Sequence, residues 1–333
     1  MSVDVSVVVP CYNGAARLPE TLRHVALQDA PPGLRWEVVL VDNASTDGTD
    51  RVAARVWPSS APAPLRVVRE ARLGLSHAHL RGFTEARGDI ITWVEDDNWI
   101  ARDWLAVIVE VMRQHPDVGA SGGLNEAVCE VAPPAWFETF SFAYAVGRQG
   151  VPGDITAGRG YLWGAGLTVR KTAWDHLARH GFRPLLVDRQ GTKLNSGGDT
   201  EICFALRLAG WRLWFEPRMR LRHFLPAHRL DWWYLRRLYQ GFGASTVGFD
   251  PYVRALAGEP VDGRRVAWAH EAGRVLADLR RQARKVLRSW RHPYEGDGEV
   301  LTLESKLGRL AELLRKRGAY DRSLRAVWHA PWR

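Results

Sequence analysis

The first hundred residues alternate between short, β-branched apolar runs and segments with helical spacing, an order that few folds accommodate. The apolar runs are VSVVVP (5–10), WEVVLVD (36–42), LRVVRE (65–70) and DIITWVED (89–96), and the helical patterns cover 14–28, 46–56 and 76–87. Continuous apolar runs suit strands that are buried on both faces. Strands that alternate with helices form right-handed βαβ units. The sequence therefore predicts an α/β fold with a mostly parallel central sheet flanked by helices.

Polar residues stand at or just beyond the carboxyl end of each predicted strand, where ligands bind in sheets of this kind. They are Tyr12, Asn13, Asp42, Asn43, Arg72, Asp96 and Asp97. Because the ends of parallel strands share one edge of the sheet, we expect these side chains to converge on a single crevice.

The fourth apolar run leads directly into three consecutive acids, Glu95, Asp96 and Asp97. A turn is one interpretation, because Asp and Asn favour turns. The charges repel, however, and two unit charges ~4 Å apart interact by about 4 kcal/mol at an effective dielectric near 20. A divalent cation carrying a diphosphate would remove this cost, since oxygen ligands suit Mg²⁺ or Mn²⁺.

Composition limits the other options. The three cysteines, Cys11, Cys129 and Cys203, are widely spaced and form no CxxC pair, which argues against a disulfide framework and a zinc site. No apolar run reaches about 18 residues, and the start lacks the pattern of a signal peptide. We expect a cytoplasmic protein. Neither GxGxxG nor GxxxxGK[ST] occurs, so a bound nucleotide would be held without these glycine loops.

The net charge of +9 is unevenly distributed. Residues 1–217 hold 22 Lys and Arg against 25 Asp and Glu, and residues 218–333 hold 24 against 12. The last third contains three amphipathic helical patterns with basic faces, at 231–243, 263–289 and 301–318. They suit packing on the body or peripheral contact with an anionic membrane at its inner face. Nucleic acid is not expected as the main ligand, because the body is slightly acidic.

Four segments together resemble the family 2 glycosyltransferases of GT-A fold. They are VVVPCYNGAARLPETL, VLVDNASTDGT, ARLGLSHAHLRGFTEARGDIITWVEDDN and GGDTEICFALRLAGWRLWFEP, in this order. The resemblance covers roughly residues 3 to 226. It implies a GT-A domain at 1–226, with a nucleotide-sugar half at about 1–100 and an acceptor half at about 101–226, followed by a helical C-terminal extension at 227–333.

The resemblance also implies roles for single residues on the donor side. Pro10, Tyr12, Asn13, Asp42, Asn43, Arg72 and Asp96 would bind the nucleoside diphosphate sugar, with UDP or dTDP favoured and GDP open. Asp97 and His223 would hold Mn²⁺ or Mg²⁺ at the diphosphate. Glu95 stands where the family more often has Asp, and no role is assigned to it.

On the acceptor side, the resemblance implies that Trp163, Gly164, Ala165 and Gly166 lie beneath the sugar. Asp199 matches the general base, and Glu201 lies two residues further along the same predicted helix. Two residues correspond to about 200° of rotation, so only one of these acids can face the cleft. The alternative for Asp199 is a helix cap.

The sequence thus predicts an inverting, metal-assisted glycosyltransferase that moves a sugar to an acceptor hydroxyl. The acceptor stays open: a glycan, a lipid-linked molecule or a small molecule. A sugar-1-phosphate nucleotidyltransferase is the alternative among enzymes, although PCYNGAARL does not cleanly supply the glycine-rich basic loop expected after its first strand. A basic module that binds membrane or nucleic acid is the alternative outside enzymes.

Overall fold

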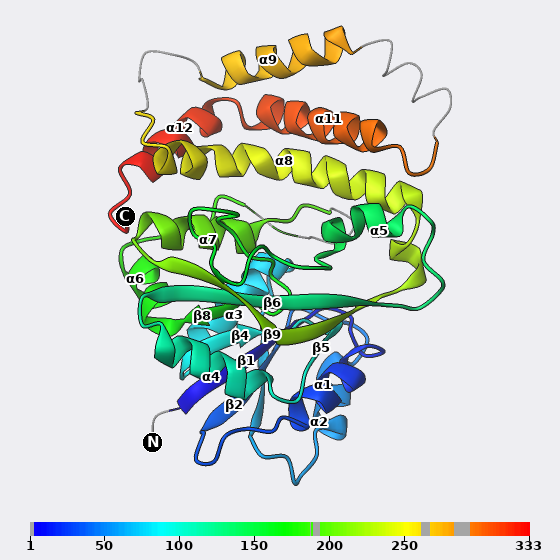
Figure 1. Ribbon diagram of the computed structural model, residues 1–333, viewed down its shortest axis with the longest axis vertical. Helices are drawn as coiled ribbons and strands as arrows, with labels where there is room; N and C mark the ends of the chain where they lie inside the picture. The colour runs from blue at the N-terminus through cyan, green and yellow to red at the C-terminus, as the bar shows by residue number, and fades with distance from the viewer. Residues whose placement is uncertain (1–2, 187, 189–193, 261–266, 283–293) are drawn as a thin grey trace.

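The computed structural model describes residues 3–186, 188, 194–260, 267–282 and 294–333. A sheet flanked by helices forms the body, and the C-terminal helices lie in layers above it (Figure 1). The body contains β1 (Val3–Cys11), α1 (Leu18–Ala26), β2 (Trp36–Asp42), α2 (Thr49–Val56), β3 (Leu65–Arg69), α3 (Leu75–Glu85), β4 (Gly88–Trp93), β5 (Asn98–Ile100), α4 (Trp104–Gln114), β6 (Val118–Cys129), α5 (Phe137–Phe140), η1 (Ser141–Tyr144), β7 (Gly153–Asp154), β8 (Thr168–Arg170), α6 (Lys171–Arg179), α7 (Gly198–Leu208) and β9 (Arg212–Leu225). The C-terminal part contains η2 (Ala227–Arg229), α8 (Trp232–Leu256), α9 (Ala267–Arg281), α11 (Gly298–Lys316) and α12 (Gly318–Trp328).

The strand order of the sheet is β3-β2-β1-β4-β8-β6-β9-β5, with β7 paired to β9. The first four strands of this order are parallel, as the alternating pattern predicts. Strands β1 and β2 are buried along nearly their whole length because their residues are apolar on both faces. This part of the fold is confirmed.

The other half of the sheet is mixed. Strand β8 is antiparallel to both β4 and β6, and β9 is parallel to β6 but antiparallel to β5. Strand β5 begins at Asn98, directly after the acidic triplet, and pairs with β9 so that Asn98 lies opposite His223. This pairing brings the end of β9 to the carboxyl end of β4.

The C-terminal helices pack on the body. Helix α8 lies across α7, and α11 lies along α8 with α9 beyond it (Figure 1). Leu235, Leu238 and Val247 on α8 are buried. Tyr252, Val327 and Trp332 join the core that is formed by the strands of the body. Among the described residues, no helix combines the length and hydrophobicity that crossing a membrane requires.

Candidate active site

Asp96 is buried beside β1 and forms an ion pair with Arg17. Its Oδ2 accepts hydrogen bonds from Arg17 Nη2 at 2.6 Å and from Cys11 Sγ at 3.3 Å. Burial and the charge of Asp97 raise the pKa of the Asp96 carboxyl, while Arg17 opposes this shift. Arg17 therefore offsets part of the repulsion between the acids.

Asp97 lies where β4, β5 and β9 meet. Its Oδ2 accepts a hydrogen bond of 2.9 Å from Arg229 Nη1, and its Oδ1 accepts one of 2.9 Å from the side chain of Asn98. His223 Nε2 lies 3.6 Å from the same Oδ1. Arg229 belongs to η2 and is 132 residues away in sequence, so the fold supplies this cation from beyond β9.

His223 is oriented as a metal-binding histidine would be. Its Nδ1 lies 2.8 Å from the Tyr144 carbonyl, which can only accept, so in the neutral ring Nδ1 carries the proton and Nε2 the lone pair. Nε2 is buried and has no hydrogen-bond partner within the described structure. Backbone carbonyls commonly orient metal-ligating histidines through the other ring nitrogen. The lone pair and the Asp97 carboxylate face each other, and this donor set fits a divalent cation.

No group of three or more His, Cys, Asp or Glu side chains suited to a metal occurs in the described part of the chain. Asp97 and His223 would therefore supply two ligands at most. Mg²⁺ typically uses one or two carboxylates together with substrate phosphates and water. Two protein ligands thus fit a cation that arrives with a diphosphate.

The ends of β1 and β2 form one connected loop structure. Asn13, whose φ is 47°, accepts a hydrogen bond from the Thr46 backbone at 2.8 Å, and its own backbone donates to Ser45 Oγ at 3.0 Å. Asp42 is buried and accepts from the Ser45 backbone at 3.1 Å. Pro10 pairs with β2 within the sheet, and Tyr12 is exposed beside the loop.

Asn43 and Arg72 lie at the connection between β3 and α3. The Asn43 amide donates to the carbonyls of Glu70 and Arg72 and accepts from the Gly74 backbone at 2.8 Å. Its hydrogen-bonding capacity is therefore used to fix this connection to the end of β2. Arg72 is largely exposed, and its Nε donates to Glu70 Oε1 at 3.0 Å.

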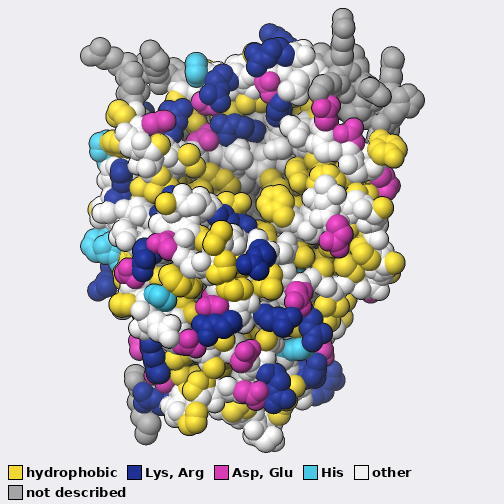
Figure 2. Space-filling model, in the orientation of Figure 1, with side chains coloured by type: hydrophobic (Ala, Val, Ile, Leu, Met, Phe, Trp, Pro, Cys, Tyr) yellow, Lys and Arg dark blue, Asp and Glu magenta, His cyan; other side chains and the backbone are white. Residues whose placement is uncertain are grey.

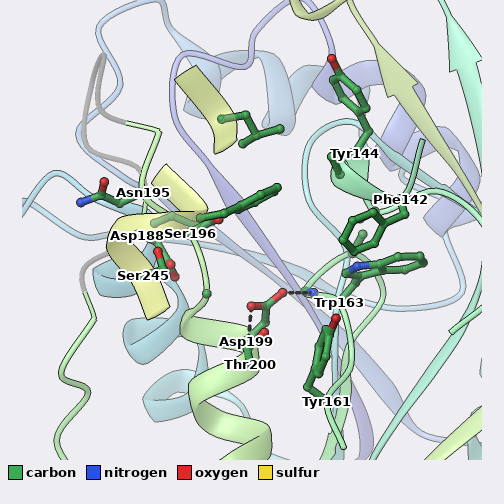
Figure 3. A pocket seen from close by; sticks show the side chains of 18 of the residues that line it. Phe142, Tyr144, Tyr161, Trp163, Asp188, Asn195, Ser196, Asp199, Thr200 and Ser245 are labelled. Carbon is green, nitrogen blue, oxygen red and sulfur yellow. Dashed lines mark hydrogen bonds between the residues drawn. The ribbon is translucent and has the colours of Figure 1, made fainter. Parts of the chain in front are cut away.

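Asp199 lies in the first turn of α7 and lines a cavity. Its Oδ2 accepts from the Gly164 backbone at 2.5 Å and its Oδ1 from the Thr200 backbone at 2.6 Å (Figure 3). Burial raises the pKa of the Asp199 carboxyl, although both hydrogen bonds act in the opposite direction. The helix cap is Gly197, so Asp199 does not occupy the cap position.

Glu201 points away from that cavity. Its carboxylate accepts hydrogen bonds from the backbones of Leu185 and Leu186, at 2.6 and 3.0 Å, and from the Tyr252 hydroxyl at 2.6 Å. Burial raises the pKa of Glu201 to about 7. Of the two acids on α7, Asp199 faces the cavity and Glu201 joins α7 to α8.

The cavity has a volume of about 410 Å³ and lies between the body and α8. Hydrophobic side chains border a hollow in this region of the surface in Figure 2. Glu95, His223, Arg229 and Asp199 line it together with Trp163, Gly164 and Ala165. Gly166 is not among the lining residues; its φ is +78°, and a Cβ there would come within 2.6 Å of Trp104.

The structure thus brings the predicted residues together in two places. The donor residues lie at the carboxyl ends of β1, β2, β3 and β4, and Asp199 with residues 163–165 forms a wall of the cavity. Sequence analysis missed Arg17 and Arg229, the cations beside the acidic triplet. It also missed the apolar side chains that α8 contributes to the cavity.

Comparisons with known proteins show which proteins this chain resembles. The model of the family described as "Glycosyl transferase family 2" matches residues 6–160. The chain is 31% identical over 117 residues to a dolichol-phosphate mannosyltransferase of Pyrococcus furiosus, which is 35% of this chain and 32% of that protein. The match thus spans about a third of that relative. Succinoglycan biosynthesis protein ExoM of Rhizobium meliloti is 25% identical over 274 residues, covering 80% of this chain and 79% of that one.

Two solved structures share the fold. A mannosyltransferase from Pyrobaculum calidifontis, in complex with GDP-Man and Mn²⁺, superimposes with a TM-score of 0.55 at 21% identity, covering 95% of this chain and 87% of that one. S. aureus TarS 1–349, in complex with UDP-GlcNAc, gives a TM-score of 0.53 at 15% identity, covering 98% and 90%. Residues 6–160 thus match glycosyl transferase family 2, and the chain shares the GT-A fold of these solved structures.

Proposed function

We propose that this glycosyltransferase transfers a sugar, with inversion, from a nucleoside diphosphate sugar to an acceptor hydroxyl, and that Asp199 is the general base. The observation that carries the proposal is the placement of Asp199 on the wall of a cavity that His223 and Arg229 also line. Both of these residues contact Asp97, the last acid of the triplet. A base and a site for a diphosphate therefore border one space.

The donor occupies the carboxyl ends of β1 and β2. The exposed ring of Tyr12 and the loop that contains Asn13 border the place where a base and ribose would lie. The buried Asp42 carboxylate can accept from a pyrimidine imide N–H, which favours UDP or dTDP. The relative with bound GDP-Man keeps GDP open. Asn43 positions the loop at 70–74, and Arg72 extends from it.

Asp97 and His223 would hold Mn²⁺ or Mg²⁺. When bound there, the ion would supply Lewis-acid stabilisation of the negative charge on the diphosphate leaving group. The protein orients His223 through the Tyr144 carbonyl. Arg229 offers a further positive charge beside the cavity.

Asp199 takes the proton of the acceptor hydroxyl. Its raised pKa makes it a stronger base than an exposed carboxylate, and a positioned base of this kind contributes about 10² to 10⁴ in rate. The backbones of Gly164 and Thr200 hold the carboxylate in place. A Cβ on Gly164 would lie 3.2 Å from Asp199 Oδ2, so a residue without a side chain suits this contact.

The test is an assay for nucleoside diphosphate release. The protein is incubated with UDP-, dTDP- and GDP-sugars, with Mn²⁺, Mg²⁺ or EDTA, and the wild type is compared with Asp199→Asn. We expect slow, metal-dependent hydrolysis of one nucleotide class. Release from none of these donors, or equal release in EDTA, would contradict the proposal.

A further inference from the structure

We infer that the acceptor carries its reacting hydroxyl on a largely apolar body, aromatic or aliphatic, which lies in the cavity between α8 and the catalytic body. This inference rests on the proposed function, because it takes the space beside Asp199 as the acceptor site. The cavity volume of about 410 Å³ is within the range of small-molecule sites.

One wall of the cavity consists of aromatic rings. Phe142 and Tyr144 come from η1, and Tyr161 and Trp163 come from the segment before β8. Figure 3 shows these four rings on one side of Asp199. Arg159 lies over the Tyr161 and Trp163 rings, 4.4 and 4.3 Å from their centres, and so holds them in position.

The opposite wall is one face of α8. Tyr234, Leu238, Phe242 and Phe249 line the cavity at spacings of four and seven residues, which places them on a single stripe of the helix. Helix α11 packs along α8 as well. The stripe thus presents an apolar surface to the cavity and to whatever the cavity binds.

Three of the hydroxyl groups around this space are engaged within the protein. The Tyr144 hydroxyl donates to the Arg229 carbonyl at 2.9 Å, so this residue offers its ring. Ser245 and Thr246 donate to carbonyls of their own helix, at 2.9 and 2.6 Å. A buried hydroxyl without a partner costs free energy. An acceptor covered with hydroxyls would therefore be disfavoured here relative to an apolar one.

Equilibrium binding tests the inference without turnover. Isothermal titration calorimetry is carried out on the full chain with UDP and Mn²⁺ present, using n-alkyl β-glucosides from butyl to octyl below their micelle concentrations. Free glucose and cellobiose are the polar comparisons. We expect affinity to rise with chain length by up to about fourfold per buried methylene. Octyl glucoside should bind at least tenfold more tightly than either polar sugar.

Two pairs of variants locate the binding. Phe142→Ala is matched by Val131→Ala, because Phe142 is 49% exposed and Val131 is 47% exposed, and only Phe142 lines the cavity. Phe242→Ala is matched by Val253→Ala, which changes an exposed residue of the same helix. We expect each phenylalanine variant to weaken octyl glucoside binding roughly tenfold. The valine variants should bind like the wild type.

The inference is overturned if affinity does not depend on chain length, if cellobiose binds as tightly as octyl glucoside, or if the valine and phenylalanine variants behave alike. A thermal-shift measurement with UDP and GDP, each with Mn²⁺, separates this result from the proposed function. Nucleotide binding without chain-length dependence contradicts the acceptor class alone. Chain-length dependence without binding of any nucleotide supports the apolar cavity and contradicts the proposed function.

Discussion

Arg229 donates a hydrogen bond of 2.9 Å to Oδ2 of Asp97; the Asp97 side chain is 3% exposed and the Arg229 side chain is 15% exposed. Burial alone would lower the pKa of the Arg229 guanidinium, but the charges of Asp97 and of the other acidic groups nearby together outweigh it and raise the pKa above its ordinary value. The last acid of the triplet is therefore neutralised by a protein cation as long as no other cation is present.

This pairing predicts that Arg229 and a divalent cation compete for Asp97. Arg229→Met leaves the buried carboxylate with Asn98 and His223, and breaking a buried pair costs about 3 kcal/mol. We expect urea unfolding to show a loss of this order, and Mn²⁺ to restore stability in the variant far more than in the wild type. An equal effect of Mn²⁺ on both proteins would argue against a metal at Asp97.

A second prediction separates the two acids of α7. Asp199→Asn should lower kcat by roughly 10² to 10⁴ while donor affinity stays near the wild-type value. Glu201→Gln should leave kcat per folded molecule nearly unchanged but reduce the free energy of unfolding by about 1 to 3 kcal/mol. The reason is that the backbone N–H groups of Leu185 and Leu186 both donate to the carboxylate, and in the variant one of them would face the NH₂ group of the glutamine and lose its acceptor. Steady-state kinetics and urea unfolding on both variants check this. The reverse pattern would assign the base to Glu201.

The raised pKa of Asp199 predicts the pH dependence of turnover. A base must be deprotonated, so kcat falls as the pH decreases through its pKa and reaches a plateau above it. Burial raises this pKa, so the acidic limb should have its midpoint above the ordinary value of about 3.9. kcat is measured at saturating donor between about pH 4 and about pH 8. A midpoint at or below the ordinary value would show that another group controls the rate.

The basic last third of the chain, which contains the predicted C-terminal extension at 227–333, leads to a prediction about membranes. The tryptophans of α8 divide between packing and solvent: Trp232 is buried, and Trp233 is 59% exposed. Residues 218–333 carry 24 basic and 12 acidic side chains, so we expect sedimentation with anionic vesicles at low salt and its loss as screening increases. Neutral vesicles are the control. If anionic vesicles fail to bind the protein at low salt, the basic helices serve to pack on the body and do not contact a membrane.

The parallel half of the fold could be predicted because each strand carries its own signal. Val5, Val7 and Val9 have no exposed surface on β1, and such continuous runs are typical of buried strands. Strands β6 and β9 mix buried residues with polar and partly exposed ones, and their pairing depends on contacts between distant segments. For this reason, the sequence analysis predicted an acceptor half at about 101–226 but did not predict the strands within it.

The same distinction applies to the candidate site. The acidic triplet indicates a cation from local charge alone. The partners Arg17 and Arg229 lie 79 and 132 residues from the acids they contact, beyond the reach of any local pattern. The apolar stripe on α8 did leave a signal, since Tyr234, Leu238 and Phe242 recur every four residues. The orientation of the two acids on α7 follows from helix geometry, which allows only one of them to face the cavity.

The central claim is that Asp97 binds a nucleoside diphosphate through a divalent metal. Titration of UDP and GDP, each with Mn²⁺ or with EDTA, into the wild type and Asp97→Asn tests it most directly, with Asp89→Asn as the control because Asp89 is an exposed acid of β4. We predict tight, Mn²⁺-dependent binding of one nucleotide to the wild type and to Asp89→Asn, and its loss in Asp97→Asn. Nucleotide affinity in Asp97→Asn that equals the wild type with Mn²⁺ present would contradict the account.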